Sequence, residues 1–367
     1  MIAIAEALGP EGFGVYEIDW SVSPPGFRRV SRPPKGLVIP GFVDIHIHGA
    51  FGIDLMSAES ADMIQLCEKL SKLGYEGFLP TTVTASAADV RKALSNLIDH
   101  PMILGFHLEG PFISPDYPGA QPPEFIAEPP AALPAAEANL RALTGQPAAE
   151  LSIWDSILDD PRLKVITMAP ELPHALELAS RLMERGVIVS MGHTNATYEE
   201  ARRGFEFGAA HTTHTFNAMR GLHHREAGIL GYALATDALR CELIYDRLHV
   251  SREAAGLLFK CKPEDRVIAV SDSTLATGLP PGQTVTMWGH ECVIGKKQVR
   301  LASNGALAGS AITLLDAFRN LHEDFGAEKA IRACCLNPRA ALGISQIKRW
   351  VQLDRESLDI EEIVEAQ

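Results

Sequence analysis

The sequence predicts an α/β protein, a (β/α)8 TIM-like barrel joined to a small β-sandwich domain formed from the chain termini. Apolar, strand-like segments alternate with helical segments along most of the chain, and this order is typical of parallel βαβ units. Counting gives about eight such strands, which favours a barrel over an open sheet. The length of 367 residues suits a single barrel with a small appendage.

The strands of the barrel are expected where short apolar runs are bounded by turn residues or polar side chains. In chain order they cover 38–47, 77–83, 102–109, 163–168, 187–193, 211–214, 240–245 and 267–272. Helices are expected between them, where apolar residues recur at helical spacing. In chain order these cover 60–73, 87–98, 175–185, 197–207 and 252–260.

Two stretches depart from this alternation. Residues 111–135 are rich in Pro and Gly, and we expect a long loop of the kind that often carries function. Residues 283–301 have the pattern of antiparallel strands joined by glycine-containing turns. Helices are then expected at 310–324 and 326–334, followed by a short capped helix that begins at Asn337.

These elements predict two parts. Residues 39–343 are expected to form the barrel, with a β insertion near 283–301. Residues 1–38 and 344–367 are expected to form the small β domain, because they have little helical pattern and the stretch 350–353 resembles a strand.

Composition and charge exclude several classes of function. The formal net charge of −13 argues against nucleic acid or an anionic membrane as the main partner. No apolar run reaches 18 residues, so we expect no membrane span. The N-terminus lacks a basic region and does not resemble a secretory signal. The six cysteines are scattered, which is typical of reduced thiols in a cytoplasmic protein.

Two histidines interrupt the first barrel strand. His46 and His48 are two residues apart, so both imidazoles are expected on the same side of the strand. A metal ion is the commonest partner that satisfies two such rings at once. Taken alone, the pair is explained slightly better by separate hydrogen bonds to backbone or carboxylate groups, so a metal site needs support from other residues.

The other chemically capable side chains follow a common rule. Each lies at or near the C-terminal end of an expected strand, and in a parallel barrel those ends meet at the face where active sites form. Imidazoles and carboxylates that converge there favour a site for Zn²⁺ or Fe²⁺. The carboxylate on the last strand is the natural acceptor for a proton of an attacking water. The set consists of His46, His48, Glu109, His193, His214 and Asp272.

Several longer motifs carry a resemblance to a known family. They include PGFVDIHIHG at 40–49, HLEGPFI at 107–113, GHTNAT at 192–197, THTFNAM at 213–219, HHREAG at 223–228, SDS at 271–273 and GALAGS at 305–310. Together these segments resemble the N-acetylglucosamine-6-phosphate deacetylase family of the amidohydrolase superfamily. The segments around Glu109 and His214 are much more specific than the His-x-His pair, which many amidohydrolases share.

The resemblance implies a role for each of these residues. Glu109, His193 and His214 are expected to hold the main metal ion. His46 and His48, with Asp272, are expected to hold a second ion that Glu109 bridges. Since some members of the family lack the His-x-His pair, either one or two ions are expected. Asp272 is also expected to act as the catalytic acid and base.

The resemblance also implies a phosphorylated amino sugar as substrate and a homodimeric assembly. Arg225 is expected to clamp the 6-phosphate, which suits a planar bidentate donor, although an exposed ion pair with Glu226 is the simpler explanation of that arginine. His249 is expected near the sugar phosphate. His107 and His211 are expected to support the metal ligands. The remaining substrate-binding positions implied are Ala120, Gln121, Asn217, Ala218, Leu307, Ala308 and Gly309.

Three departures from the family pattern stand out. Gln121 occupies a position where many relatives carry histidine, and an amide cannot become cationic to polarise the scissile carbonyl. Arg247 replaces a usual glycine. The segment 344–349 lacks the expected Gly- and Asp-rich stretch, which leaves the completeness of the small β domain in question.

The motifs favour hydrolysis of the acetamide of N-acetylglucosamine 6-phosphate. The alternative is a related amidohydrolase that acts on another N-acyl sugar or on a cyclic amide. A non-catalytic sensor or scaffold would require loss of a ligand or of Asp272, and neither is lost.

Overall fold

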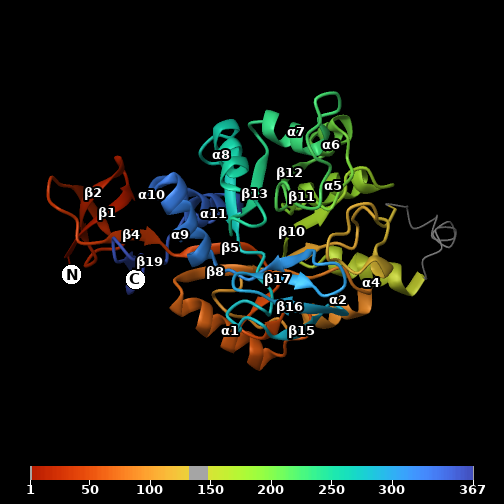
Figure 1. The fold of residues 1–367 in the computed structure, drawn as a ribbon, viewed down its shortest axis with the longest axis horizontal. Coiled ribbons are helices and arrows are strands. Elements are labelled where there is room, and N and C mark those ends of the chain that lie inside the picture. The colour runs from red at the N-terminus through yellow and green to blue at the C-terminus, as the bar shows by residue number, and fades with distance from the viewer. Residues whose placement is uncertain (1, 132–147, 367) are drawn as a thin grey trace.

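The computed structural model describes residues 2–131 and 148–366, without the side chains of residues 148–152. Within that range the fold is α/β, as predicted, and its centre is a curled sheet of parallel strands that follow one another in chain order (Figure 1). These strands are β5 (Phe42–Ile47), β8 (Tyr75–Pro80), β9 (Phe106–Glu109), β10 (Leu163–Met168), β11 (Ile188–Met191), β12 (Ala209–Thr212), β13 (Arg240–Ile244) and β14 (Val267–Val270).

Hydrogen bonding between these strands is continuous from β9 to β14, and β5 pairs separately with β8. Single parallel bridges link the two groups. Phe78 with Ile103 joins β8 to the segment before β9, and Ile47 with Ser273 joins β5 to the segment after β14. One apolar cluster draws side chains from β5, β8, β10, β13 and β14, which places these strands around a common interior.

The predicted helices lie between the strands, with ends close to the expected positions. They are α1 (Ser60–Lys72), α2 (Ala87–Ser95), α5 (Ala175–Glu184), α6 (Tyr198–Glu206) and α8 (Arg252–Cys261). The side chains of Ser86, Thr197 and Ser251 each accept a backbone N–H at the start of a helix, which explains where α2, α6 and α8 begin.

Two helices were not predicted. The segment Gly228–Ala235 forms α7, and it is apolar on every side, so it carries no helical periodicity. The segment Ala148–Leu158 forms α4. The long loop expected at 111–135 contains one short 3-10 turn, η1 (Pro123–Phe125), and its last four residues lie outside the described residues.

After β14 the chain forms the expected antiparallel insertion. Strands β15 (Thr284–Met287), β16 (His290–Ile294), β17 (Gln298–Leu301) and β18 (Leu307–Ser310) pair in that order. The next helix begins later than predicted, at Leu314, because β18 occupies the preceding residues and Thr313 caps the helix. The helical elements are α9 (Leu314–Phe325), α10 (Ala327–Ile331), the π-helical η4 (Arg332–Leu336) and α11 (Asn337–Ala341).

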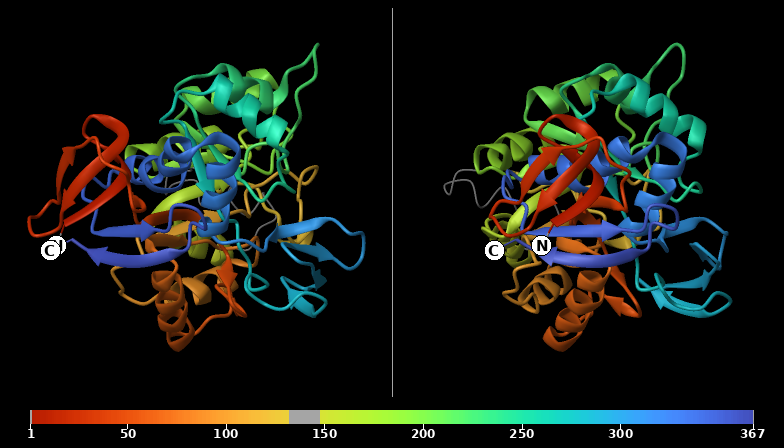
Figure 2. Two further views of the ribbon diagram at one scale, coloured as in Figure 1. Left: turned by 60° about the vertical axis from the view of Figure 1, so that its left-hand side comes forward. Right: turned by 90° about the vertical axis from the view of Figure 1, so that its left-hand side faces the viewer.

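Both ends of the chain contribute to a second sheet, so the two termini lie side by side (Figure 2). The ring centroids of Phe27 and Trp350 are 5.3 Å apart although their strands are four positions apart in the sheet, so the sheet folds over on itself like a sandwich. The residue boundaries predicted for the two parts stay a prediction. The strand order is β20 (Ile360–Glu365), β19 (Arg349–Leu353), β4 (Leu37–Pro40), β1 (Ile2–Gly9), β2 (Gly12–Asp19) and β3 (Gly26–Arg29).

Within the described part of the chain, every helix is too short or too polar to cross a lipid bilayer.

A buried ion pair joins the terminal sheet to the parallel sheet. The guanidinium of Arg339 in α11 lies 2.5 Å from the carboxylate of Glu76 in β8 and donates to the carbonyl of Gly41 at 2.7 Å. The same carboxylate oxygen accepts the backbone N–H of Arg349 in β19 at 2.9 Å. Loss of the arginine would therefore leave a largely buried carboxylate without its cation.

We expect the substitution Arg339→Met to reduce the free energy of unfolding by about 3–5 kcal/mol, because breaking a buried pair leaves one charge uncompensated. Urea denaturation of both proteins measures the difference. The matched control is Arg202→Met in α6, whose pairs with Glu199 and Glu206 are exposed and screened by solvent, and it is expected to change the free energy of unfolding much less. Equal costs for the two variants would contradict the role assigned to Arg339.

Candidate metal centre

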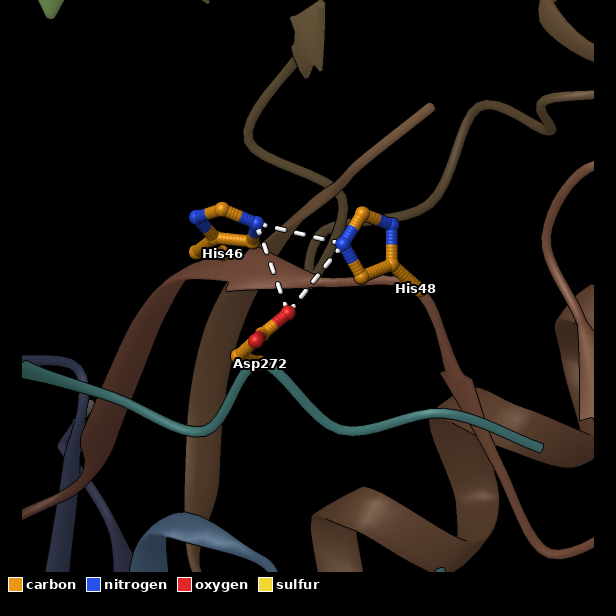
Figure 3. Close-up of side chains that lie close together, drawn as sticks. All are labelled: His46, His48 and Asp272. Atoms are coloured by element: carbon orange, nitrogen blue, oxygen red, sulfur yellow. Dashed lines mark hydrogen bonds and ion pairs between the residues drawn. The ribbon is translucent and has the colours of Figure 1, made fainter. Parts of the chain in front are cut away.

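The six predicted ligands lie together at the C-terminal ends of the parallel strands. Among residues 2–131 and 148–366 they form two groups, and the ligand atoms in each group lie within 4.8 Å of one another. One group is His46, His48 and Asp272, which Figure 3 shows with the two rings and the carboxylate turned toward a common point. The other group is Glu109, His193 and His214.

Local backbone conformation aims three of these side chains. His193, His214 and Asp272 each lie two residues past the end of a strand, and their φ angles are 46°, 27° and 48°. Left-handed backbone is unfavourable for residues other than glycine and recurs at functional sites. The conformation also explains why β12 ends at Thr212, although the sequence predicted a strand as far as His214.

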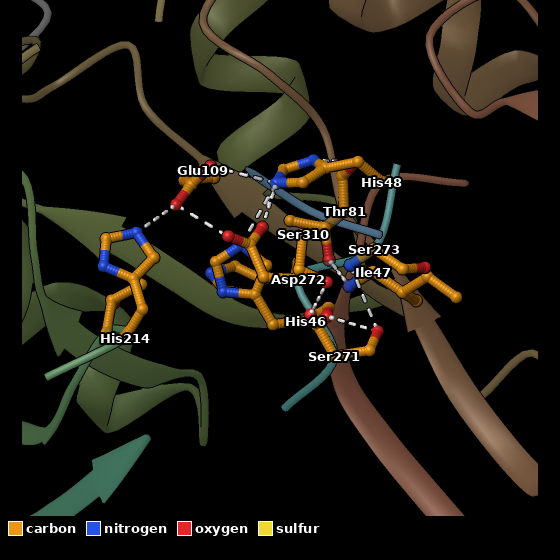
Figure 4. A network of polar contacts seen from close by, with 12 residues as sticks. His46, Ile47, His48, Thr81, Glu109, His214, Ser271, Asp272, Ser273 and Ser310 are labelled. Carbon is orange, nitrogen blue, oxygen red and sulfur yellow. Dashed lines mark hydrogen bonds and ion pairs between the residues drawn. The ribbon is translucent and has the colours of Figure 1, made fainter. Parts of the chain in front are cut away.

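Glu109, the last residue of β9, connects the two groups (Figure 4). Its Oε1 lies 3.1 Å from Nε2 of His214, 3.4 Å from that of His193 and 3.3 Å from that of His46. Its Oε2 lies 3.3 Å from Nε2 of His48. The geometry therefore suits the bridging carboxylate that the sequence motifs implied.

The hydrogen-bond chemistry of the ligands calls for a cation. The Nδ1–H of His48 donates to the carbonyl of Thr81 at 3.2 Å, and the Nδ1–H of His193 donates to the carbonyl of Tyr117 at 3.0 Å. In the neutral ring, Nε2 then carries a lone pair. For His48 that lone pair faces carboxylate oxygens of Glu109 and Asp272, so acceptors face acceptors. A divalent metal ion satisfies such a donor-poor cluster of imidazole and carboxylate ligands.

Burial and charge act in opposite directions on these groups. Burial by itself would lower the pKa of His48, but hydrogen bonds to Asp272 and Glu109 raise it to about 9. Burial would raise the pKa of Asp272, but the hydrogen bond from His48 and the charge of His46 hold it below its ordinary value. Asp272 is therefore a carboxylate at neutral pH, as a proton acceptor must be.

A carboxylate that the sequence analysis missed supports His46. Glu242 in β13 is fully buried, and its Oε2 lies 3.3 Å from Nδ1 of His46. Its other oxygen lies 3.7 Å from Nδ1 of His211, while His107 packs against His46 with ring centroids 4.6 Å apart. Such partners fix the orientation of a metal-binding imidazole. The sequence signal that could have revealed Glu242 is a carboxylate within the largely apolar strand expected at 240–245.

A cavity of about 170 Å³ opens beside the ligands and contains most of the predicted substrate positions. Within the described structure, Arg225 and Ala308 do not line it. Arg225 is exposed and contacts His224, whereas Ala308 is buried among the apolar side chains of the insertion. The predicted positions that line the cavity are Ala120, Gln121, Asn217, Ala218, His249, Leu307 and Gly309.

Three cavity residues were absent from the predicted set, namely Gly119, Ile244 and Trp288. Trp288 lies in the turn between β15 and β16, and its ring centroid is 5.2 Å from that of His48. Ile244 ends β13 and adds an apolar surface. Tryptophan in an exposed hairpin turn carries no sequence signal for a site, because its position over the cavity depends on how the insertion folds.

The segment around His249 shows how this chain accommodates Arg247. Asp246 accepts the backbone N–H of His249 at 2.7 Å and its Nδ1–H at 2.7 Å, which fixes the ring. Arg247 has a φ of 65°, a conformation that favours glycine. Its guanidinium is held by Asp324 at 2.7 Å and Glu323 at 2.8 Å, and these contacts offset the backbone cost.

Comparison with known proteins decides the family. Residues 37–348 match the model of the amidohydrolase family. The chain belongs to this family. It is 34% identical over 309 residues to the N-acetylglucosamine-6-phosphate deacetylase of Bacillus subtilis, which covers 82% of this chain and 73% of that protein. The resemblance that the sequence motifs indicated is thereby confirmed.

Two further relatives extend the comparison. The N-acetylgalactosamine-6-phosphate deacetylase of Escherichia coli O157:H7 is 33% identical over 329 residues, 87% of this chain and 81% of that protein. The crystal structure of the N-acetylglucosamine-6-phosphate deacetylase of Thermotoga maritima superposes with a TM-score of 0.85 at 30% identity, covering 100% of this chain and 98% of that one. The predicted α/β fold class, with a small β domain beside the curled parallel sheet, is therefore confirmed.

Removal of divalent metal with a chelator is expected to lower the thermal unfolding midpoint, and added Zn²⁺ is expected to restore it. An ion that binds only the folded site stabilises it by about 2.7 kcal/mol at 100 times its Kd. Scanning calorimetry with and without chelator measures the difference.

The difference in unfolding midpoint between the metal-bound and the metal-free protein is expected to grow as the pH rises from 6 to 9. In the metal-free protein the pKa of His48 is about 9 against an ordinary 6.5, so its protonation adds stability fully below pH 6.5 and loses it as the pH rises through 9. Metal binding requires the deprotonated ring, so the affinity for the metal ion rises over the same pH range. A difference that does not change with pH would contradict this assignment.

Proposed function

We propose that the protein hydrolyses the acetamide of N-acetyl-D-glucosamine 6-phosphate to D-glucosamine 6-phosphate and acetate, in the breakdown or recycling of amino sugars. One observation carries the proposal. Five of the six ligands, including Asp272, border a single cavity in a chain 34% identical to a deacetylase with this substrate. Water adds to the acetamide carbonyl, the C–N bond breaks, and the amine leaves with a proton.

Asp272 is the residue proposed to move that proton. It lines the cavity and is ionised, so it accepts a proton from the attacking water and then delivers it to the departing nitrogen. A bound divalent ion polarises the carbonyl and makes the water more acidic. We propose Zn²⁺ or Fe²⁺, as one or two ions per chain, because imidazole with carboxylate is a donor set suited to both.

Asn217, Ala218 and His249 are proposed to hold the sugar phosphate, and the backbone around Ala120, Leu307 and Gly309 is proposed to enclose the acetamide. His249 lines the cavity and is fixed by Asp246, so the orientation of its ring is set before a ligand binds. The similarity to the E. coli relative supports N-acetylgalactosamine 6-phosphate as a second candidate substrate. Acetate release from the two phosphorylated sugars and from unphosphorylated N-acetylglucosamine separates these possibilities.

The variant Asp272→Asn is expected to reduce kcat by about 10²- to 10⁴-fold while the fold is retained, because the amide cannot accept the proton. Acetate release measures kcat, and metal analysis of the same samples shows whether ligand loss contributes. The control is Asp159→Asn, at an exposed pair with Arg185. Full activity of Asp272→Asn would rule out this mechanism.

We also propose a homodimer in the cytoplasm, in which Arg225 reaches the cavity of the other subunit. The loop of residues 221–225 is exposed, and Arg225 does not line the cavity of its own chain as the structure describes it. A contribution from a second copy therefore reconciles its position with the expected phosphate clamp. The reducing cytoplasm suits the six cysteines, all within the described residues and all free thiols.

Mixing two impaired variants tests the clamp. Arg225→Ala is expected to raise KM at least tenfold for the phosphorylated sugar, since it removes a bidentate phosphate contact. When subunits of Arg225→Ala and Asp272→Asn are exchanged by mild denaturation and refolding, each mixed dimer regains one intact site, and activity is expected to reappear. Mixtures no more active than the separate variants would show that Arg225 does not act across subunits.

A further inference from the structure

The side chain of Gln121 is fixed at both ends of its amide. Its Oε1 accepts the backbone N–H of Thr84 at 2.7 Å, and its Nε2 donates to Oε2 of Glu109 at 2.6 Å. A backbone N–H only donates and a carboxylate only accepts, so the two partners independently dictate the same orientation of the amide. All three residues are buried, with Gln121 5% exposed.

The loop that carries Gln121 is itself held closely against the ligands. Gly119 has a φ of 60°, and a Cβ atom there would lie 3.1 Å from Cε1 of His193. The N–H of Gln121 donates to the carbonyl of Pro118 at 3.0 Å, closing a turn. The turn therefore places the amide beside Glu109 without relying on a bound substrate.

The carboxylate oxygen of Glu109 that Gln121 binds is the one that faces His48. Oε2 of Glu109 lies 3.3 Å from Nε2 of His48, whereas Oε1 lies near His193 and His214 and is also 3.3 Å from Nε2 of His46. Rotation about the last bond of the glutamate side chain would carry Oε2 away from His48 and leave the bridge to Oε1 alone. The hydrogen bond from Gln121 opposes that rotation and leaves a second lone pair of Oε2 available to a cation.

We propose that Gln121 is a positioning residue that keeps Glu109 in its bridging orientation and thereby sets the affinity of the ion held by His46, His48 and Asp272. This inference rests on the metal-dependent function proposed above. Its main role differs from polarisation of the scissile carbonyl, because one of the two amide N–H groups is committed to the carboxylate. A histidine here would retain one donor and one acceptor, but its cationic form would compete with the metal for Glu109.

The experiment measures metal binding directly. Wild type, Gln121→Leu and Gln121→His are stripped with chelator, and Zn²⁺ affinity and stoichiometry are determined by calorimetric titration and elemental analysis. Gln121→Leu is expected to bind its first ion with unchanged affinity and its second about 10- to 100-fold more weakly, the usual effect of losing a partner of a metal ligand. Gln121→His is expected to keep the second affinity within about threefold, because it still has a donor for Glu109.

The matched control is Gln352→Leu, which removes an amide donor from Glu361 in the terminal sheet and is expected to change neither affinity. Circular dichroism of the metal-free variants confirms that each is folded. Wild-type binding of both ions by Gln121→Leu, or an equal loss at both sites, would overturn the proposal. So would a wild type that binds only one ion, or a histidine variant as weak as the leucine variant. Wild type that binds two ions but releases no acetate would instead contradict the proposed function alone.

Discussion

The structure depends on a concentration of hydrogen-bond acceptors around Glu109. Imidazole Nε2 atoms of His46, His193 and His214 lie 3.1–3.4 Å from one carboxylate oxygen, and His48 faces the other. In water, lone pairs so close together would be separated by solvent, but these groups are buried. They require either protons on the rings or a metal ion. The Nδ1–H groups of His48 and His193 donate to backbone carbonyls, so Nε2 is unprotonated in the neutral ring. This arrangement favours the metal.

The parallel sheet supplies this arrangement at a local cost. Strand ends bring the ligands to one face, but three ligands also adopt left-handed backbone, which costs about 1–3 kcal/mol each. Structural zinc contributes about 10–16 kcal/mol in well-studied small domains, so a metal ion bound here with comparable affinity would outweigh the strain. The surrounding sheet must nevertheless hold the same geometry before the ion arrives. Bridges such as Ile47 with Ser273 serve that purpose, because they tie the His-x-His strand to the segment that carries Asp272.

The sequence predicted the elements whose cause is local. Periodic helices with capping residues, such as α6 at Thr197, and the strand-end position of the ligands follow from neighbouring residues alone. The role of Glu242 and the place of Trp288 over the cavity depend on contacts between distant segments, so no short motif reveals them. The helix α7 was missed for another reason, since apolar residues on all sides remove the periodicity by which a helix is recognised. The exposed position of Arg225 likewise depends on the tertiary structure and not on the residues next to it.

The departures of this chain from its family follow a common physical rule. Arg247 adopts a conformation suited to glycine, and two carboxylates of α9 hold its side chain. Gln121 stands where the family pattern leads us to expect histidine, and the N–H of Thr84 and the carboxylate of Glu109 use both ends of its amide. In each case the polar end of the unusual residue is held by groups outside its own segment. A substitution at such a position is therefore tolerated when the surrounding structure supplies complementary donors and acceptors, and it changes function through those partners rather than by itself.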